Sequence, residues 1–280
     1  MNNNTTQTSL KAGLYIVATP IGNLDDITLR ALHTLKSSDI ILCEDTRHSR
    51  KLLSHYSIKK TLWSYNDHST ESIRNKIVQE ITAGKAIALI SDAGTPLISD
   101  PGYKLVEYAH QHNIFVTACP GACSPINALT ISGAPTNNFL FLGFLPIQNK
   151  ERKQTLKNVK CSKASSIIFS TPRKLEADLL DIKNELGNIE IHITRELTKI
   201  FEQRLSDNIN NLLYYHKQTP LKGEIILILP PQELDADTSE LKHKINQLKA
   251  NKFSSKDIVK IITITNPNLS KNEIYKLTIN

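Results

Sequence analysis

The chain has 280 residues, and its proportions of hydrophobic (40%) and charged (22%) residues are ordinary for a folded protein, so extensive disorder is excluded. Its apolar runs are too short to span a bilayer, its N-terminus lacks an export pattern, and four scattered cysteines suit a reducing cytosol better than a disulfide scaffold. The net charge of +7 favours a polyanionic partner. We therefore expect a cytoplasmic protein.

The first half of the chain alternates short apolar runs with segments of helical periodicity, which is typical of a mainly parallel α/β sheet. Apolar residues from Ile73 to Ile81 recur at helical spacing and predict a helix that ends before Gly84. Four runs that are apolar on both faces, as in buried parallel strands, predict strands at Leu14–Thr19, Ile40–Cys43, Ala86–Ser91 and Ile114–Ala118.

A break at Ser132–Pro135 is followed by polar, basic sequence, and we place a domain boundary there. Strands are predicted beyond it at Phe139–Leu145, Ser165–Ser170, Ile189–Thr194 and Glu224–Leu229. In the third of these, isoleucines alternate with polar residues, which indicates one less buried face. We expect an N-terminal α/β domain at residues 1–135, a second α/β domain at 136–234 and a small helical unit at 235–280.

Three loops rich in glycine and proline each follow a predicted strand directly, at residues 18–26, 91–102 and 119–125. In open α/β sheets, ligands bind beyond the carboxyl ends of the strands. One such loop is more often a plain turn between a strand and a helix. Three together predict a common binding cleft.

The composition of these loops narrows the ligand. They contain no Lys or Arg, and the chain has neither a G-x-x-x-x-G-K-[ST] nor a G-x-G-x-x-G motif, so a phosphate-rich cofactor is disfavoured. Glycines let the backbone approach a ligand, and prolines leave carbonyl acceptors without N–H donors. Together with Asp92 and Asp100, the loops form an acceptor-rich cleft that suits adenine, ribose hydroxyls and a sulfonium cation.

Several strings of residues carry a family resemblance. They are residues 15–28, Cys43–Arg47, Ser91–Pro96, Pro120-Gly121 with Ser124, Gly133–Pro135, Gly143–Pro146, Arg195–Lys199, Lys222–Glu224 and Tyr275–Leu277. Through them the sequence resembles the tetrapyrrole-methylase superfamily and, within it, the ribosomal RNA small subunit methyltransferase I family of cytidine 2′-O-methyltransferases. The resemblance covers nearly the whole chain. Residues 169–173 depart from the Glu-Ser-Pro-His-Arg string that is usual in relatives.

The resemblance implies two α/β domains with S-adenosyl-L-methionine in the cleft between them, and a homodimer. It also implies that the substrate is a cytidine ribose in 16S rRNA of the small ribosomal subunit. Thr95 stands where many tetrapyrrole-modifying relatives have Asp, which favours the RNA branch. The expected cofactor contacts are Pro20, Asp92, Gly94, Thr95, Ile98, Ser124, Pro125, Phe169 and Gly223.

Methyl transfer to a ribose hydroxyl requires aligned reactants and gains from a general base. The candidate bases are Asp45, Asp100 and His68, and Arg47 is a candidate clamp for a phosphate or an alkoxide. Each has a structural alternative. Asp45 and Arg47 would form a local ion pair, Asp100 is better explained as the N-cap of the following helix, and His68 would be an ordinary surface residue.

Other polar and sulfur-containing residues have open or structural interpretations. Glu196 and Lys199 are equally consistent with ion-paired architecture and with substrate contact. Cys119 and Cys123 lack partners at metal-ligand spacing, so we expect both to be buried and expect no metal.

Basic segments indicate where RNA would bind. Residues 150–174 contain eight Lys or Arg against one acid, and a second basic cluster covers residues 47–51. Such runs are often only solvated surface, but contacts of this kind give affinity for phosphates. Stacking on a single-stranded target would require aromatic side chains such as Trp63, Tyr65 and Tyr103. The expected RNA contacts are Arg47, Arg50, Lys51, Lys150, Arg152, Lys153 and Lys157, with further lysines in the last helical unit.

Two alternative functions stay open. One is another methyltransferase of the same fold, acting on a tetrapyrrole or a protein side chain, which the Cys43–Arg47 string, Thr95 and the basic second domain disfavour. The other is a non-catalytic RNA-binding assembly factor, which the intact cleft loops disfavour.

Overall fold

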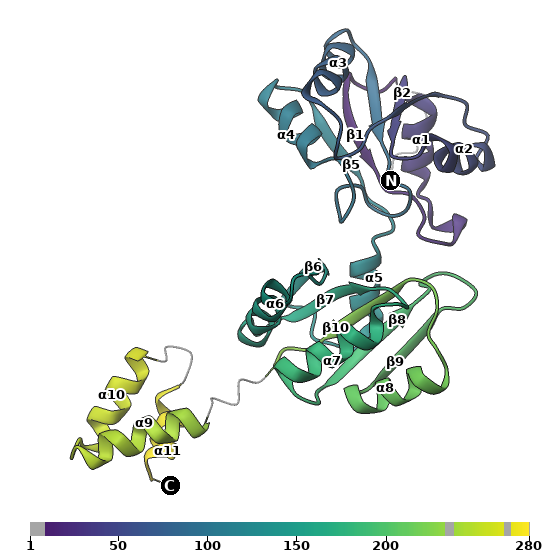
Figure 1. Cartoon of the computed structure of the whole chain (residues 1–280). Coiled ribbons are helices and arrows are strands. Elements are labelled where there is room, and N and C mark those ends of the chain that lie inside the picture. Colours follow the sequence, from purple (N-terminus) through teal and green to yellow (C-terminus); the bar gives the residue numbers. More distant parts are fainter. Residues whose placement is uncertain (1–8, 233–237, 266–269, 280) are drawn as a thin grey trace, which may run out of the picture.

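A computed structural model describes residues 9–232, 238–265 and 270–279, and it contains two α/β domains followed by a helical unit (Figure 1). The predicted α/β class is therefore confirmed. Within the described residues, no helix combines the length and the apolar character that crossing a bilayer requires.

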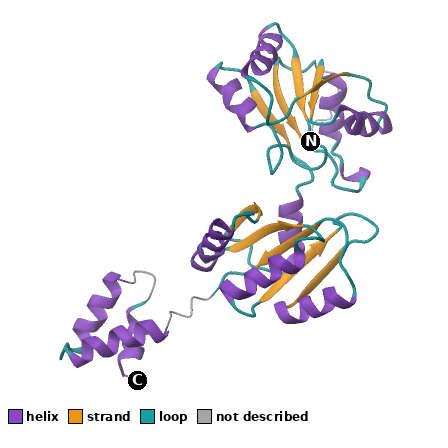
Figure 2. Cartoon of the chain, viewed as in Figure 1, coloured by secondary structure: helices purple, strands orange, loops and turns teal. Residues whose placement is uncertain are grey.

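The first domain is a five-stranded parallel sheet in the order β3-β2-β4-β1-β5. Its strands are β1 (Gly13–Val17), β2 (Ile40–Cys43), β3 (Thr61–Ser64), β4 (Ala86–Leu89) and β5 (Val116–Cys119). Its helices are η1 (Leu24–Asp26, a 3-10 turn), α1 (Leu29–Ser37), α2 (Thr46–His55), α3 (Glu71–Thr82) and α4 (Tyr103–Gln111). Figure 2 shows helices on both sides of this sheet.

Two hydrophobic clusters cover the two faces of this sheet. Tyr15 and Val17 of β1 belong to the cluster that includes Leu35 of α1, whereas Leu14 and Ile16 belong to the cluster on the α3 side. Both faces of β1 are therefore buried, which explains its continuous apolar sequence. This burial fixes the carboxyl ends of the strands, and hence the starting points of the three loops.

The second domain is a mixed five-stranded sheet in the order β6-β7-β10-β8-β9. Its strands are β6 (Phe139–Phe144), β7 (Ser165–Ser170), β8 (Glu190–Arg195), β9 (Gln203–Asn208) and β10 (Ile225–Leu229). Its helices are α5 (Ser124–Ser132), α6 (Asn149–Cys161), α7 (Leu175–Leu186) and α8 (Ile209–Gln218). Strands β6 and β7 are parallel, and the other pairs are antiparallel.

Helix α5 corrects two expectations drawn from the sequence. It contacts β8, β9 and β10, with Ala128 and Leu129 in the same apolar cluster as Ile226, so by packing the first domain ends before Ser124 rather than at residue 135. The Gly-Ala-Pro break ends a helix, since Gly133 is its left-handed C-cap (φ +85°). The face of β8 that was expected to be less buried is also covered, and His192 is buried there.

The C-terminal unit consists of α9 (Thr238–Ala250), α10 (Ser255–Thr265) and α11 (Lys271–Ile279). The three helices bury a small cluster of their own, formed by Leu241, Ile245, Ile258, Ile262 and Ile274. This cluster contains no residue of either α/β domain. The unit therefore has its own apolar core.

Candidate active site

The three loops predicted to converge are hydrogen-bonded to one another at the carboxyl ends of β1, β4 and β5. Thr19 and Gly94 exchange two backbone hydrogen bonds, of 2.8 and 3.0 Å. The Thr95 hydroxyl donates to the Ala122 carbonyl oxygen at 2.9 Å. The loops at residues 18–26, 91–102 and 119–125 thus form one unit, and their predicted convergence is confirmed.

Two glycines permit this close approach. Gly94 has φ +78°, a left-handed conformation that side chains disfavour, and a Cβ there would lie 3.1 Å from Ile21 Cγ2. At Gly121 a Cβ would lie 2.9 Å from the Ala18 Cβ, which is too close for any larger residue. Gly94 therefore allows the first and second loops to touch, and Gly121 allows the first and third loops to touch.

A cavity of about 270 Å³ lies between these loops and the end of the second sheet. This volume is close to the lower end of the usual range for small-molecule sites, ~300–1,000 Å³. Six of the nine expected cofactor contacts line the cavity: Gly94, Thr95, Ile98, Ser124, Pro125 and Phe169. The loop after β4, the start of α5 and strand β7 thus contribute to one cavity.

The other three expected contacts lie outside the cavity lining. Pro20 is buried. Asp92 is half-buried beside the wall, and its buried Oδ1 atom has no hydrogen-bond partner within the described part of the chain. Gly223 has φ +86°, and a Cβ there would overlap the Glu196 carboxyl group. Glycine at this position therefore makes room for the Glu196 carboxylate, which accepts the Glu224 N–H at 2.9 Å.

The apolar part of the cavity lining was not predicted from the sequence. Ile21, Leu197, Ile226 and Phe144 all line it, and the Phe144 ring packs edge-on against Phe169 with centroids 5.5 Å apart. Apolar residues in or beside strands resemble ordinary core residues, so no signal in the sequence distinguishes these four from the rest of the sheet.

The loop between β8 and β9 connects the second domain to the first. Asn23 donates its backbone N–H to Thr198 Oγ1 at 3.2 Å, and a Cβ on Gly22 would overlap the side chain of Lys199. Lys199 Nζ lies 3.0 Å from Glu196 and 3.2 Å from Glu224. Glu196 and Lys199 are thus ion-paired, and their loop supplies Leu197 to the cavity wall.

Asp100 is the one candidate base among the three that lines the cavity. It does not cap a helix, because α4 begins at Tyr103 with Gly102 at the N-cap and no side-chain cap. Burial raises the pKa of its carboxyl to about 6, opposed in part by the Ser91 hydroxyl and supported by the charges of Glu44 and other nearby acids. A half-buried carboxylate of this pKa is suited to accept a proton near neutral pH.

Asp45 and Arg47 form the local ion pair that was the structural alternative. The Asp45 carboxylate caps α2 by accepting the Arg47 N–H at 2.8 Å, and it lies 3.0 Å from Arg47 Nη2, with the two side chains 37% and 85% exposed. These hydrogen bonds from Arg47 lower the pKa of Asp45 to about 2. His68 is exposed, in a turn in which its N–H donates to Asn66.

Comparisons with known proteins decide the family. The sequence profile of the family described as Tetrapyrrole (Corrin/Porphyrin) Methylases matches residues 13–213. A Rickettsia prowazekii protein named "Ribosomal RNA small subunit methyltransferase I" is 46% identical over 270 residues, 96% of each chain. One of the same name from Halalkalibacterium halodurans is 40% identical over 95% of this chain and 94% of its own. The chain belongs to the tetrapyrrole methylase family, in the ribosomal RNA small subunit methyltransferase I group.

A solved structure supports the tetrapyrrole methylase fold independently. A diphthine synthase matches 78% of this chain and 89% of its own with a TM-score of 0.61, at 12% identity. At that identity the likeness concerns the fold alone. The predicted arrangement of tetrapyrrole-methylase type is therefore confirmed.

One of the residues predicted to contact RNA is not available to do so. Arg152 is only 8% exposed, and its guanidinium is ion-paired with Asp178 and Asp181. The prediction for Arg152 is wrong because the basic run lies on an amphipathic helix, and this position faces α7. The other six predicted contacts are exposed: Arg47, Arg50, Lys51, Lys150, Lys153 and Lys157.

The aromatic and cysteine candidates also differ from one another in how buried they are. Tyr65 is a core residue, whereas Tyr103 is exposed and Trp63 is half-buried beneath Lys76 Nζ, 4.4 Å from its ring. Cys119 is buried as predicted, but Cys123 is half-buried and lines the cavity. In the part of the chain that the structure describes, no group of three or more His, Cys, Asp or Glu could hold a metal ion.

Proposed function

We propose that this chain transfers a methyl group from S-adenosyl-L-methionine to the 2′-hydroxyl of a cytidine in 16S rRNA of the small ribosomal subunit. The observation that carries the proposal is 46% identity over 96% of both chains with a relative named for small-subunit rRNA methylation. The cavity supports it, because six residues expected to contact the cofactor line one wall.

The residues around the cavity fit S-adenosyl-L-methionine. Among the described residues that line the cavity there is no Lys or Arg. The lining combines Phe144 and Phe169 with the hydroxyls of Thr95 and Ser124 and the carboxylate of Asp100. Apolar and aromatic walls with a few polar groups are usual for a site that holds a nucleoside. The cofactor supplies a methyl group activated by a sulfonium centre. Asp92, beside the site, has a buried Oδ1 atom that finds no hydrogen-bond partner among the described residues, and a donor group of the ligand would satisfy it.

We propose that Asp100 is the general base for the ribose hydroxyl. It lines the cavity, and its raised pKa allows it to bind a proton during the reaction and release it at neutral pH. Asp45 and Arg47 then have a different role. Their ion pair holds the start of α2. The Arg47 side chain is 85% exposed, so its solvent-facing N–H groups can donate to a phosphate.

Exposed basic side chains support an RNA substrate. Lys150, Lys153 and Lys157 lie along α6, and Arg50 and Lys51 lie along α2. Residues 238–280 add eight lysines against three acids, and this small unit thus carries most of the net charge of +7. Contacts of this kind supply affinity for phosphates without reading sequence.

The proposed activity is tested with purified protein, methyl-labelled S-adenosyl-L-methionine and small ribosomal subunits from a strain that lacks the corresponding gene. Label is expected in 16S rRNA of these subunits and at a much lower level in subunits from the parent strain, whose target is already modified. Label on a ribosomal protein, or on a tetrapyrrole supplied in a parallel assay, would favour another enzyme of the fold. Binding of subunits without cofactor binding would favour an assembly factor.

We also propose a cytoplasmic homodimer, on the basis of the family resemblance. The chain has a mass of 31.4 kDa, so light scattering on the purified protein should give a molar mass close to twice this value. A mass close to that of a single chain at assay concentrations would contradict the dimer.

A further inference from the structure

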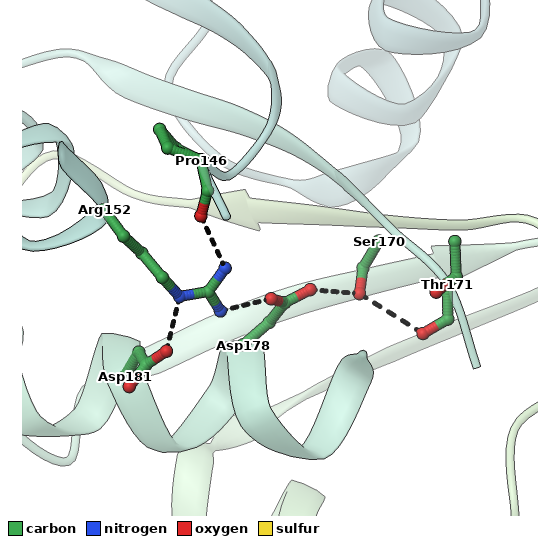
Figure 3. Close-up of polar contacts among 6 residues, drawn as sticks. All are labelled: Pro146, Arg152, Ser170, Thr171, Asp178 and Asp181. Carbon is green, nitrogen blue, oxygen red and sulfur yellow. Dashed lines mark hydrogen bonds and ion pairs between the residues drawn. The ribbon is translucent and has the colours of Figure 1, made fainter. Parts of the chain in front are cut away.

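A buried polar network surrounds Arg152 (Figure 3). Its Nη2 donates to Asp178 Oδ1 and its Nε donates to Asp181 Oδ2, while Nη1 lies 3.4 Å from the Pro146 carbonyl oxygen. The second oxygen of Asp178 accepts the Ser170 hydroxyl. One guanidinium thus joins the start of α6, the loop after β6, helix α7 and the end of β7.

At the centre of the network lies the buried carboxylate of Asp178. Asp178 is 2% exposed and Ser170 is 4% exposed, whereas the Asp181 side chain is 41% exposed. Both oxygens of Asp178 are therefore occupied, one by Arg152 and one by Ser170, as a buried carboxylate requires. Burial would lower the pKa of Arg152, but the hydrogen bonds to Asp178 and Asp181 raise it overall. The guanidinium is therefore fixed in its charged form.

Each end of the network lies next to a residue of the cavity wall. Ser170 itself lines the cavity, as does its neighbour Phe169, although its hydroxyl is directed to Asp178 (Figure 3). Pro146, whose carbonyl faces Arg152, follows shortly after Phe144 at the end of β6. The rings of Phe144 and Phe169 pack edge-on against each other across β6 and β7.

We propose that Arg152, Asp178 and Ser170 are positioning residues for the methyl donor, which hold Phe144 and Phe169 in the geometry that the donor requires. This inference rests on the proposed function, because it assumes that the cavity binds the donor. It assigns to Arg152 a role in the cofactor site in place of the RNA contact that its basic neighbourhood indicates. The network and the two rings together fix the end of β6 against the end of β7.

The test uses Ser170→Ala, which removes one hydrogen bond to a buried carboxylate without removing a charge. Binding of S-adenosylhomocysteine is measured by calorimetry on the full-length protein. We expect Kd to rise about tenfold or more, because the hydrogen bond that is lost joins the end of β7 to a buried, charged carboxylate. The KM for small subunits should stay within about twofold, because the RNA-binding side chains are unchanged.

Two control variants separate positioning from general destabilisation. Val159→Ala shortens a buried side chain of α6 and lowers stability without touching the network. Asp181→Asn removes the negative charge of the exposed partner of Arg152 but leaves the Arg152–Asp178–Ser170 contacts in place. Both variants should bind S-adenosylhomocysteine within about twofold of wild type, even where their melting temperatures fall as far as that of Ser170→Ala.

Wild-type affinity in Ser170→Ala overturns the proposal, and so does an equal loss of affinity in Val159→Ala, which would make the effect one of stability. A rise in the KM for small subunits with unchanged donor binding overturns it too, because the network would then serve the RNA. Failure of the wild-type protein to bind S-adenosylhomocysteine would instead contradict the proposed function itself. In that case no positioning role would remain to be tested.

Discussion

Thr95 donates its hydroxyl hydrogen to the Ala122 carbonyl oxygen at 2.9 Å, and this hydrogen bond joins the loop after β4 to the loop after β5. Both loops supply residues to the cavity. The width of the cofactor cleft therefore depends on a hydrogen bond between two loops that are far apart in the sequence.

Thr95→Val should weaken donor binding at least tenfold, because the isosteric methyl group leaves the Ala122 carbonyl without its partner and releases the two loops. The stability loss should be about 1 kcal/mol. Calorimetry with S-adenosylhomocysteine and chemical denaturation measure the two effects. Thr130→Val is the matched control, since its hydroxyl donates only to the exposed Asn127 carbonyl within α5. Equal binding by both variants would contradict a role for the Thr95 hydroxyl.

Gly94→Ala should weaken donor binding at least tenfold. The added methyl group would meet Ile21 at 3.1 Å, and Gly94 has φ +78°, which costs a non-glycine residue about 1 kcal/mol or more. Gly84→Ala is the control, because Gly84 also has a positive φ (+100°) but has open space around the Cβ position. We expect both variants to lose a similar amount of stability, and only Gly94→Ala to bind the donor more weakly. Retained binding in Gly94→Ala would contradict the close approach of the loops.

Asp100→Asn should lower kcat by about 10²–10⁴-fold, the usual contribution of a general base, with donor affinity little changed. In the wild-type enzyme, kcat/KM should fall below a pH of about 6, where the carboxyl of the free enzyme becomes protonated. The variant should lack this acidic limb. Profiles of kcat and kcat/KM against pH measure both effects, and an unchanged limb in the variant would exclude Asp100 as its origin.

The same residue should make the folded protein less stable as pH rises. The pKa of Asp100 is about 6 in the folded chain against an ordinary value of 3.8, so the folded state binds this proton more tightly. The stabilisation of the folded state by this proton is complete below about pH 4 and is lost as the pH rises through 6. The loss is up to about 3 kcal/mol, because each unit of difference in pKa is worth about 1.36 kcal/mol. Asp100→Asn should therefore be more stable than wild type at pH 8 and nearly equal to it at pH 4. Denaturation curves at both pH values test this, and a less stable variant at pH 8 would contradict it.

Lys153→Ala combined with Lys157→Ala should weaken binding of small subunits and make it less dependent on salt. The slope of log affinity against log salt should fall by about 1 for each phosphate that the variant no longer neutralises. Donor binding should not change, because neither lysine lines the cavity. Lys36→Ala combined with Lys60→Ala is a control of equal charge, away from α6. An equal effect of both pairs would show that net charge, and not this helix, determines binding.

The loops of the site were predictable because their position follows from a general rule about strand ends, and because Gly94 and Pro96 leave a clear signal in the sequence. Strands β3 and β9 were not predicted. Each lies at an edge of its sheet. Both strands contain only exposed and half-buried residues. Edge strands are held by backbone hydrogen bonds on one side, which hydrophobic periodicity does not reveal.

Arg152 and Asp100 show where local patterns fail. The charge pattern of residues 150–174 does not reveal that one position of α6 meets Asp178, 26 residues away. For Asp100, the spacing to the following helix suggested a cap, but Gly102 occupies that position and leaves the carboxylate at the cavity. Both roles depend on packing between segments, which a single sequence does not contain.

The central claim is tested most directly by identifying the labelled nucleoside. Small subunits that lack the modification are incubated with the protein and methyl-labelled S-adenosyl-L-methionine, and the 16S rRNA is digested completely and separated by mass. Label is expected in 2′-O-methylcytidine alone, and much less of it with Gly94→Ala. Label on the base of any nucleotide, or on a ribose other than that of cytidine, would contradict it.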